Sequence, residues 1–600
     1  MTDLKHKRAD QLSRSRWIST GALGCVAVFL YACTIQGDPS STSKVSNDPT
    51  LTDMAAVSSI EDIPRSALGG YLAGHHARNA FDPKAAAEFF SRTLYSDPDN
   101  PQLLHQVLVA QIAQGRLESS LAIAQRLTHQ RDSEPLALLI LAADSAKELR
   151  FAEARKYLAK FPESSLYPFI KSLLSAWAMA GEGDIAGALN ELEFLNSSPN
   201  FSPTHDYHAA LIADVLQKET QARSAYTSAL SAARRPSIRS VIAAGSFYER
   251  HGDTEVARQL YSSFQETGPE QTVLDQMLLN LTKAGPARKL VNTATEGFAE
   301  ALYEISASLF RERAYEPALI YCQTALFLRP ELDVAHMQLA DIYAATGNYD
   351  LAVSAFQAMP NSSPYSWSAR IRMADSLNEI GETEEALREL RSLALQQPGR
   401  VDPLLALADM LRLKEQYEDA IVIYDEAISR IQPVEKQHWT IFYARGMSLE
   451  RNGDWEQAES DFLQALHLQP DQPLVLNYLG YSWVEQGTKL TEAKSMIQRA
   501  VAQRPNDGYI VDSLGWVLYQ LEEFDNALIH LERAVELRPD DAVINDHYGD
   551  ALWSAGRHSE ARFQWLRALS LDPEAELQKS VQKKLERPTP RKSVQATDKP

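Results

Sequence analysis

The chain has 600 residues, of which 44% are apolar and 23% charged, a balance that is typical of folded protein and excludes a disordered or fibrous chain. The formal net charge of −20 opposes contact with phosphate backbones and anionic lipid headgroups, so no nucleic-acid partner is expected. The three cysteines are too few for a disulfide framework or a four-thiolate zinc site.

Residues 1–32 are predicted to be an export signal. A basic stretch precedes an apolar run from Trp17 to Ala32, which is shorter than the roughly 20 residues of a membrane-spanning helix, although an uncleaved anchor is the alternative. The run ends in Leu30-Tyr31-Ala32-Cys33, which resembles a bacterial lipobox. The resemblance implies cleavage before Cys33 and lipidation of this cysteine.

The residue after the lipidated cysteine directs sorting in such lipoproteins. Here it is Thr34 rather than the aspartate that commonly retains lipoproteins at the inner membrane. The resemblance therefore implies a chain that is lipid-anchored to the outer membrane, on its periplasmic face. Residues 33–66 are rich in polar residues without a sustained apolar period, and they are predicted to form a flexible tether.

A period of about 34 residues fills the chain from residue 67 onward. In the last copy a small residue, Gly549, is followed by Ala561, the large Trp565 and Pro573. The small residues allow two helices to touch, the large one fills the groove against the next repeat, and the proline ends the second helix. This spacing resembles that of the tetratricopeptide repeat.

The resemblance implies an all-α fold, a superhelical solenoid of about 14 helix-turn-helix repeats. The predicted parts are, in chain order, a degenerate N-terminal array at 67–269, an irregular joint or degenerate repeat at 270–298, a C-terminal array at 299–573, a capping helix at 574–586 and a disordered tail at 587–600.

The sequence lacks the motifs of common catalytic centres. It contains no HExxH, P-loop or CxxC pattern, so neither an enzyme nor a cofactor or metal site is expected. Cys322 occupies a large-residue position of its repeat and is predicted to be a core thiol. Asp546, His547 and Asp550 share a helix, but no second histidine has ligand spacing, so a solvated acidic face is the preferred interpretation over a metal site.

The concave surface of such arrays is formed by defined positions of each first helix, and these positions are aromatic and acidic in the C-terminal repeats. Aromatic anchors beside carboxylates suit a protein partner that carries apolar and basic groups. The alternative is that Trp516 and Trp553 only pack between adjacent first helices. The predicted protein-binding residues are Asn477, Tyr481, Tyr509, Asp512, Trp516, Tyr519, Asp546, Asp550 and Trp553.

Residues 476–568, with LNYLGYSW, DGYIVDSLGWVLYQL and INDHYGDALW, resemble the C-terminal half of long proteobacterial tetratricopeptide lipoproteins of the LbcA type. The resemblance implies a periplasmic scaffold that binds envelope proteins, as an adaptor that presents peptidoglycan hydrolases to a carboxy-terminal processing protease. The alternative function is that of an assembly chaperone or pilotin-like lipoprotein for a secretin, pilus or polysaccharide-export complex.

Overall fold

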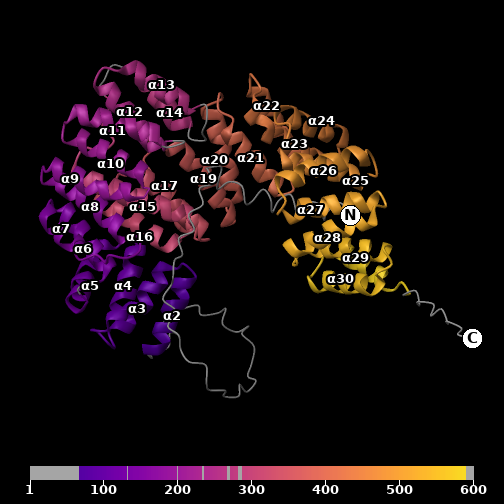
Figure 1. Cartoon of the computed structure of the whole chain (residues 1–600), viewed down its shortest axis with the longest axis horizontal. Helices are drawn as coiled ribbons and strands as arrows, with labels where there is room; N and C mark the ends of the chain where they lie inside the picture. The colour runs from indigo at the N-terminus through magenta and orange to yellow at the C-terminus, as the bar shows by residue number, and fades with distance from the viewer. Residues whose placement is uncertain are drawn as a thin grey trace, which may run out of the picture. The chain divides into compact units, whose positions relative to one another are not determined.

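The computed structural model describes residues 67–131, 133–198, 201–232, 236–265, 271–281 and 287–588. The predicted signal segment, Cys33, the tether and residues 589–600 of the predicted tail lie outside them. All regular elements in the described part of the chain are helices, which confirms the all-α prediction (Figure 1). None of these helices is long and apolar enough to cross a membrane.

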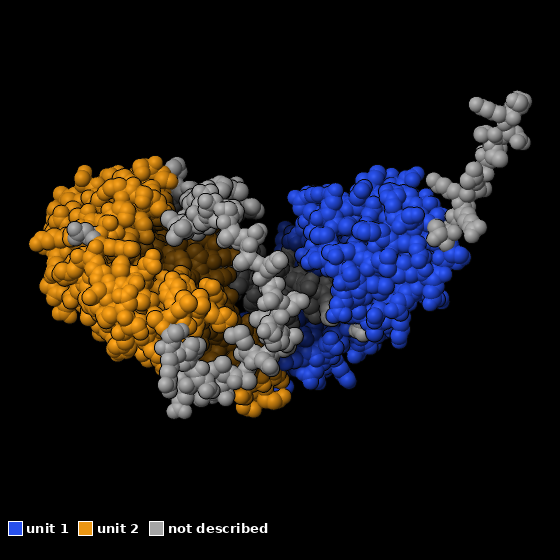
Figure 2. Space-filling model, turned by 90° about the horizontal axis from the view of Figure 1, so that it is seen from below, with its two compact units in different colours: residues 1–43, 391–600 blue, residues 44–390 orange. Residues whose placement is uncertain are grey.

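The chain divides into two compact units. In chain order, the described residues of the first run from 67 to 390 (orange, unit 2 in Figure 2) and those of the second from 391 to 588 (blue, unit 1 in Figure 2). The helices of the first unit are α2 (Ala67–Asn79), α3 (Pro83–Leu94), α4 (Pro101–Ala113), α5 (Leu117–Gln130), α6 (Pro135–Lys147), α7 (Phe151–Leu158), α8 (Tyr167–Gly181), α9 (Ile185–Leu192), η3 (Glu193–Ser197), α10 (Ser202–Val215), α11 (Glu219–Ala232), α12 (Ile238–Arg250), α13 (Thr254–Gln265), α14 (Gln271–Asn280), α15 (Ala294–Arg311), α16 (Tyr315–Leu328), α17 (Asp333–Ala345), α18 (Tyr349–Gln357), α19 (Ser366–Glu379) and α20 (Thr383–Gln396), which crosses the boundary.

The helices of the second unit are α21 (Asp402–Leu413), α22 (Tyr417–Arg430), η4 (Lys436–His438), α23 (Trp439–Asn452), α24 (Trp455–Leu468), α25 (Pro473–Glu485), α26 (Leu490–Gln503), α27 (Gly508–Gln520), α28 (Phe524–Leu537), α29 (Ala542–Ser554), α30 (His558–Ser570) and α31 (Ala575–Leu585).

Fourteen turns between paired helices among the described residues contain a residue with positive φ, which reverses the chain within a short turn, and the turn at Gly487 contains a second one, Lys489. The count agrees with the predicted 14 repeats. Consecutive positions are 34 or 35 residues apart, except at two breaks. The first break includes α14 and falls in the predicted joint, and the second includes η4. These residues are Phe81, Gly115, Leu149, Gly183, Gln217, Gly252, Arg313, Gly347, Gly381, Glu415, Gly453, Gly487, Glu522 and Gly556.

The small and large residues of a repeat pack against each other. A Cβ atom at Gly549 would lie 2.5 Å from the Trp565 ring, and one at Gly446 would lie 2.7 Å from the Phe462 ring. The large residue therefore fills the space that the glycine of its own repeat leaves. It also reaches the following repeat, since the ring centroids of Phe462 and Tyr478 are 5.2 Å apart.

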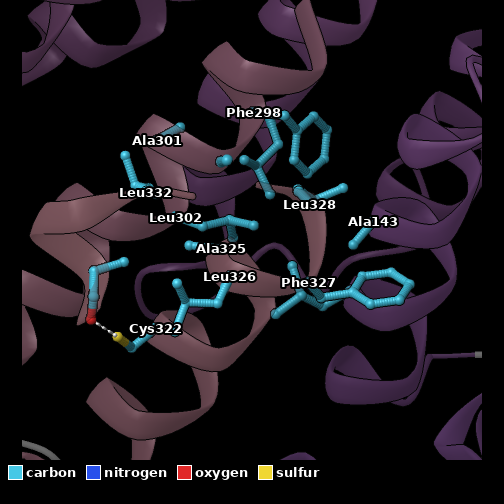
Figure 3. Close-up of a cluster of buried hydrophobic side chains, with 14 of the residues drawn as sticks. Ala143, Phe298, Ala301, Leu302, Cys322, Ala325, Leu326, Phe327, Leu328 and Leu332 are labelled. Atoms are coloured by element: carbon cyan, nitrogen blue, oxygen red, sulfur yellow. Dashed lines mark hydrogen bonds between the residues drawn. The ribbon is translucent and has the colours of Figure 1, made fainter. Parts of the chain in front are cut away.

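The apolar core of the first unit joins helices that are distant in sequence. Helices α15 and α16 pack against α4, α6, α8 and α10 as well as against each other (Figure 1). Figure 3 shows Phe298 and Leu302 of α15 and Phe327 of α16 in one cluster with Ala143 of α6.

Cys322, also drawn in Figure 3, is fully buried, and its Sγ donates to the carbonyl oxygen of Ala335 at 3.2 Å. Burial raises the pKa of this thiol, which opposes formation of a reactive thiolate. The prediction of a core thiol is confirmed.

Candidate protein-binding surface

The nine predicted binding residues lie on α25, α27 and α29, the first helices of three consecutive repeats. Tyr509, Asp512 and Asp546 are buried, whereas the other six are half-buried. Helices α25, α27 and α29 each pack against the second helix of their own repeat, and α27 also packs against both α25 and α29.

Trp516 is the centre of a stack of three rings. Its ring centroid lies 4.0 Å from that of His547 and 4.9 Å from that of Tyr519, with interplanar angles of 12° and 13°. The indole Nε1 donates to Glu485 Oε1 of the preceding repeat at 3.0 Å. Trp516 therefore connects three consecutive repeats and remains half-buried, so packing and partial exposure coexist at this position.

The buried Asp512 fixes the histidine of this stack. Its carboxylate oxygens lie 3.0 and 3.1 Å from His547 Nδ1, and Asp512 is fully buried. Such a hydrogen bond orients the imidazole ring beneath Trp516. Asp512 thus supports the aromatic stack from inside and is not a surface carboxylate.

The aromatic residues beside the stack also have partners within the protein. The Tyr509 hydroxyl accepts a hydrogen bond from Arg538 Nη2 at 2.7 Å. The Tyr519 hydroxyl lies 3.4 Å from the Ser554 hydroxyl, which donates to it. The Trp553 ring packs against His558 and Trp565, with centroid distances of 4.4 and 5.2 Å.

On α25, the side chains of Asn477 and Tyr481 are half-buried. The Asn477 Oδ1 atom is buried and accepts no hydrogen bond from the protein.

Asp546 and Asp550 form an ion-pair cluster with Lys584 of α31. Lys584 Nζ donates to both Asp546 oxygens at 2.8 Å and to Asp550 Oδ2 at 2.7 Å. The expectation of a solvated acidic face is wrong here, because the three side chains are only 8 to 13% exposed. In the part of the chain that the structure describes, no group of three or more His, Cys, Asp or Glu side chains has the arrangement of a metal site.

The pKa values in this cluster reflect burial and like charge. Burial, followed by the nearby Asp550 carboxylate, raises the pKa of Asp546 to about 6, although Lys584 acts in the opposite direction. Burial lowers the pKa of Lys584, but the two carboxylates more than offset this effect and its pKa is raised. The cluster therefore holds α31 against α29 through a charged contact.

Sequence reasoning missed the partners Glu485 and Lys584. A usable signal was present for Lys584, which stands 34 residues after Asp550. One repeat period separates the two residues, so α31 takes the place of a further first helix. No comparable offset identifies Glu485, whose contact with Trp516 depends on how neighbouring first helices are inclined.

The arrangement can offer aromatic surface to a partner, because aromatic side chains that are already held in one conformation lose little entropy on binding. Its three aspartates are engaged with His547 and Lys584. Recognition of basic groups by these carboxylates would therefore require exchange of internal partners, and binding by the nine residues stays a prediction.

Comparison with known proteins identifies the repeats. Residues 334–358, 371–435, 443–508, 485–542 and 513–576 match the tetratricopeptide repeat family. The TPR repeat-containing protein PA4667 of Pseudomonas aeruginosa is 29% identical over 160 residues, which cover 26% of this chain and 26% of that protein. The human protein O-mannosyl-transferase TMTC1 is 24% identical over 203 residues, which cover 34% of this chain and 22% of that protein.

These alignments span about a quarter of the length of the two relatives. Among solved structures, the crystal structure of the APC/C hetero-tetramer Cut9-Hcn1 has 14% identity and a TM-score of 0.36, and the match covers 86% of this chain and 96% of that chain. The family matches coincide with the helix pairs from α17 to α30. The chain therefore contains tetratricopeptide repeats, which build a solenoid that is generally not catalytic.

Proposed function

We propose that this protein is a lipid-anchored scaffold on the periplasmic face of the outer membrane. It binds envelope proteins and presents peptidoglycan hydrolases to a carboxy-terminal processing protease, without catalysing a reaction itself. The tetratricopeptide repeats support a role in protein–protein interaction. A scaffold of this kind acts by raising the effective concentration of its two ligands near each other.

The observation that carries the proposal is the stack around Trp516. The ring is half-buried, is fixed between His547 and Tyr519, and has its indole N–H bonded to Glu485. Rigid aromatic residues of this kind supply a large share of interface energy, because little side-chain entropy is lost when they are covered.

The decisive experiment is in-cell crosslinking, followed by purification of the full-length protein from gently solubilised envelopes and mass spectrometry of its partners. We expect a processing protease together with peptidoglycan hydrolases. Stoichiometric recovery of a secretin, pilus or polysaccharide-export apparatus would contradict the adaptor role and favour the assembly alternative.

The Trp516→Ala variant tests the surface itself, and Phe563→Ala is its matched control. Phe563 is an aromatic residue of α30 that is 67% exposed, so its removal leaves the stack intact. We expect Trp516→Ala to reduce captured partners at least tenfold with helicity unchanged, and Phe563→Ala to retain them. Equal capture by both variants would contradict the assignment of this surface.

The anchor has its own test. Replacing Cys33 by serine should move the protein from the membrane fraction to the soluble periplasmic fraction and abolish incorporation of labelled fatty acid. The matched control is Cys25→Ser, which alters the cysteine within the predicted signal segment. Retention of label by Cys33→Ser would contradict lipid anchoring at this residue.

A further inference from the structure

The first unit contains a helical hairpin, α15–α16, that lies against the first helices of the six preceding repeats. Figure 1 shows α15 and α16 inside the curve that α4 to α12 trace. We call the surface that they cover the inner face of the first unit, and we define it by the residues that contact α15, α16 or the following α17, namely Arg78, Ala113, Ala146, Lys147, Trp177, Tyr207, His208 and Arg239.

The centre of the contact is a buried ion pair. Arg239 Nε of α12 donates to Glu300 Oε1 of α15 at 2.8 Å, and the Tyr207 hydroxyl of α10 donates to the same oxygen at 2.9 Å. The exposed fractions of the Arg239 and Glu300 side chains are 9% and 0%. Burial acts against the charge of Glu300, but Arg239 and Tyr207 more than offset it and keep its pKa below the ordinary value.

A second chain of contacts, buried except at Glu304, lies beside this pair. Trp177 Nε1 of α8 donates to His208 Nδ1 at 2.9 Å, and His208 Nε2 lies 2.9 Å from Glu304 Oε2 of α15. Gly297 allows α15 to approach, because a Cβ atom at this position would overlap the Trp177 ring. The fit between α8 and α15 is therefore close as well as polar.

The contact also includes α2 and α6. Arg78 Nη2 of α2 donates to Glu316 Oε2 of α16 at 2.8 Å, and the Lys147 ammonium lies 3.6 Å from the centroid of the Phe327 ring. Thr295 Oγ1 donates to the carbonyl oxygen of Ala146 at 2.9 Å.

A partner that entered this surface would have to replace all of these contacts. Loss of the Glu300 carboxylate with α15 in place would leave the Arg239 guanidinium buried without its partner, and loss of one member of a buried ion pair is strongly unfavourable.

We propose that α15–α16 is the permanent occupant of this inner face, so that the hairpin closes the first unit and partner proteins bind on the second unit. The clause about partners rests on the proposed function, whereas closure does not. The two units would then have different roles: the first unit is a rigid spacer, and the second unit provides the binding surface.

The test of closure uses the full-length protein with a protease site inserted between Leu281 and Ala287, which separates α14 from α15. After cleavage, we expect the two pieces to co-elute as one complex in non-denaturing buffer. In Glu300→Ala they should dissociate at least about 100-fold faster, because a buried ion pair is broken. Separation of the unsubstituted pieces at micromolar concentration would overturn the proposal.

Two further variants keep this test decisive. Glu312→Gln alters an exposed carboxylate on the same hairpin and should leave dissociation unchanged; an effect as large as that of Glu300→Ala would contradict the role of the ion pair. If Glu300→Ala fails to fold, Thr295→Val removes only the hydrogen bond to Ala146 and should accelerate dissociation about tenfold. No acceleration in Thr295→Val would overturn the proposal.

A photo-crosslinking residue at Glu304 tests the clause about partners. It should capture only segments of this chain, and a crosslink to another protein would overturn that clause. If no partner is captured anywhere on the protein, the proposed function fails, while co-elution of the cleaved pieces still establishes closure.

Discussion

Replacing Lys584 by methionine tests the charged contact that holds α31. The Lys584 ammonium lies within 2.8 Å of carboxylate oxygens of both Asp546 and Asp550. Methionine retains an unbranched apolar side chain of similar length but removes the charge. The variant thus leaves two carboxylates, one turn apart on α29, without their cation.

The magnitude follows from the pKa of Asp546. With Lys584 present, the rise from 3.8 to about 6 already disfavours the charged form by about 3 kcal/mol. Without Lys584, the Asp546 carboxyl can take up a proton instead of staying charged. Protonation of a carboxyl with the ordinary pKa of 3.8 costs about 4 kcal/mol at pH 7. The total cost at Asp546 therefore cannot exceed about 4 kcal/mol, which is about 1 kcal/mol more than with Lys584 present. Asp550 loses its partner as well, and an unrelieved broken pair costs about 3–5 kcal/mol. We expect Lys584→Met to lower the free energy of opening α31 by about 2 kcal/mol, which corresponds to a roughly 30-fold larger opening constant.

Hydrogen–deuterium exchange of α31 amides in the full-length protein measures this opening, because the terminal helix of a solenoid can open without global unfolding. Lys583→Met is the matched control, since Lys583 is exposed on the same helix. Unchanged protection of α31 in Lys584→Met, or an equal loss in Lys583→Met, would refute the reasoning.

The dependence on pH has a definite sign. The folded-state pKa of Asp546 exceeds the unfolded value, so folding takes up a proton between about pH 6 and 3.8. The contribution of this carboxyl to stability therefore improves as the pH falls through 6 and worsens as it rises. In Lys584→Met the folded-state pKa of Asp546 should rise further, because the cation that opposes the rise is gone. The protection of α31 amides that is lost at pH 7.5 should therefore partly return at pH 5.5, after correction for intrinsic exchange rates.

Three further variants or measurements test the packing of the repeats. Gly549→Ala should destabilise the second unit by about 1–3 kcal/mol in urea unfolding, because the new methyl group meets the buried Trp565 ring, whereas Gly399→Ala, which meets no atom within 4 Å, should be near neutral. Leu149→Gly should stabilise the first unit by about 1 kcal/mol in thermal unfolding, because Leu149 is 69% exposed and has a φ of 60°. Cys322 should resist alkylation in the native protein and react in urea, as peptide mass spectrometry would show; rapid native labelling would contradict its burial.

The repeat architecture was predictable because its contacts are local. Gly549 meets Trp565 sixteen positions later, and this spacing recurs between Gly446 and Phe462. A fixed offset of this kind is visible in a single sequence. Turns at non-glycine residues such as Leu149 and Glu522 were harder to recognise, because their positive φ is imposed by the helices on either side.

The candidate site was predictable only in part. Their positions in the repeat predicted that Trp516 and Asp512 lie on the same helix, and both are on α27. Repeat position alone does not determine burial, which depends on the next repeat: His547 covers Trp516 and bonds Asp512, while Lys584 of α31 bonds Asp546. An interpretation of the aspartates as surface charges overlooked these neighbours.

The sequence by itself determined the succession of helix pairs, because each pair is specified by contacts within one repeat and with the next. Only the tertiary structure decided that α15–α16 covers the inner face of the first unit. Arg239 and Glu300 are 61 residues apart, and Arg78 and Glu316 are 238 apart. Both separations exceed the single period of about 34 residues over which neighbouring repeats contact each other, so the repeat pattern predicts neither contact. These residues meet because small rotations between successive repeats accumulate into a curve, and the distance at which a curved array returns to itself depends on all of those rotations together.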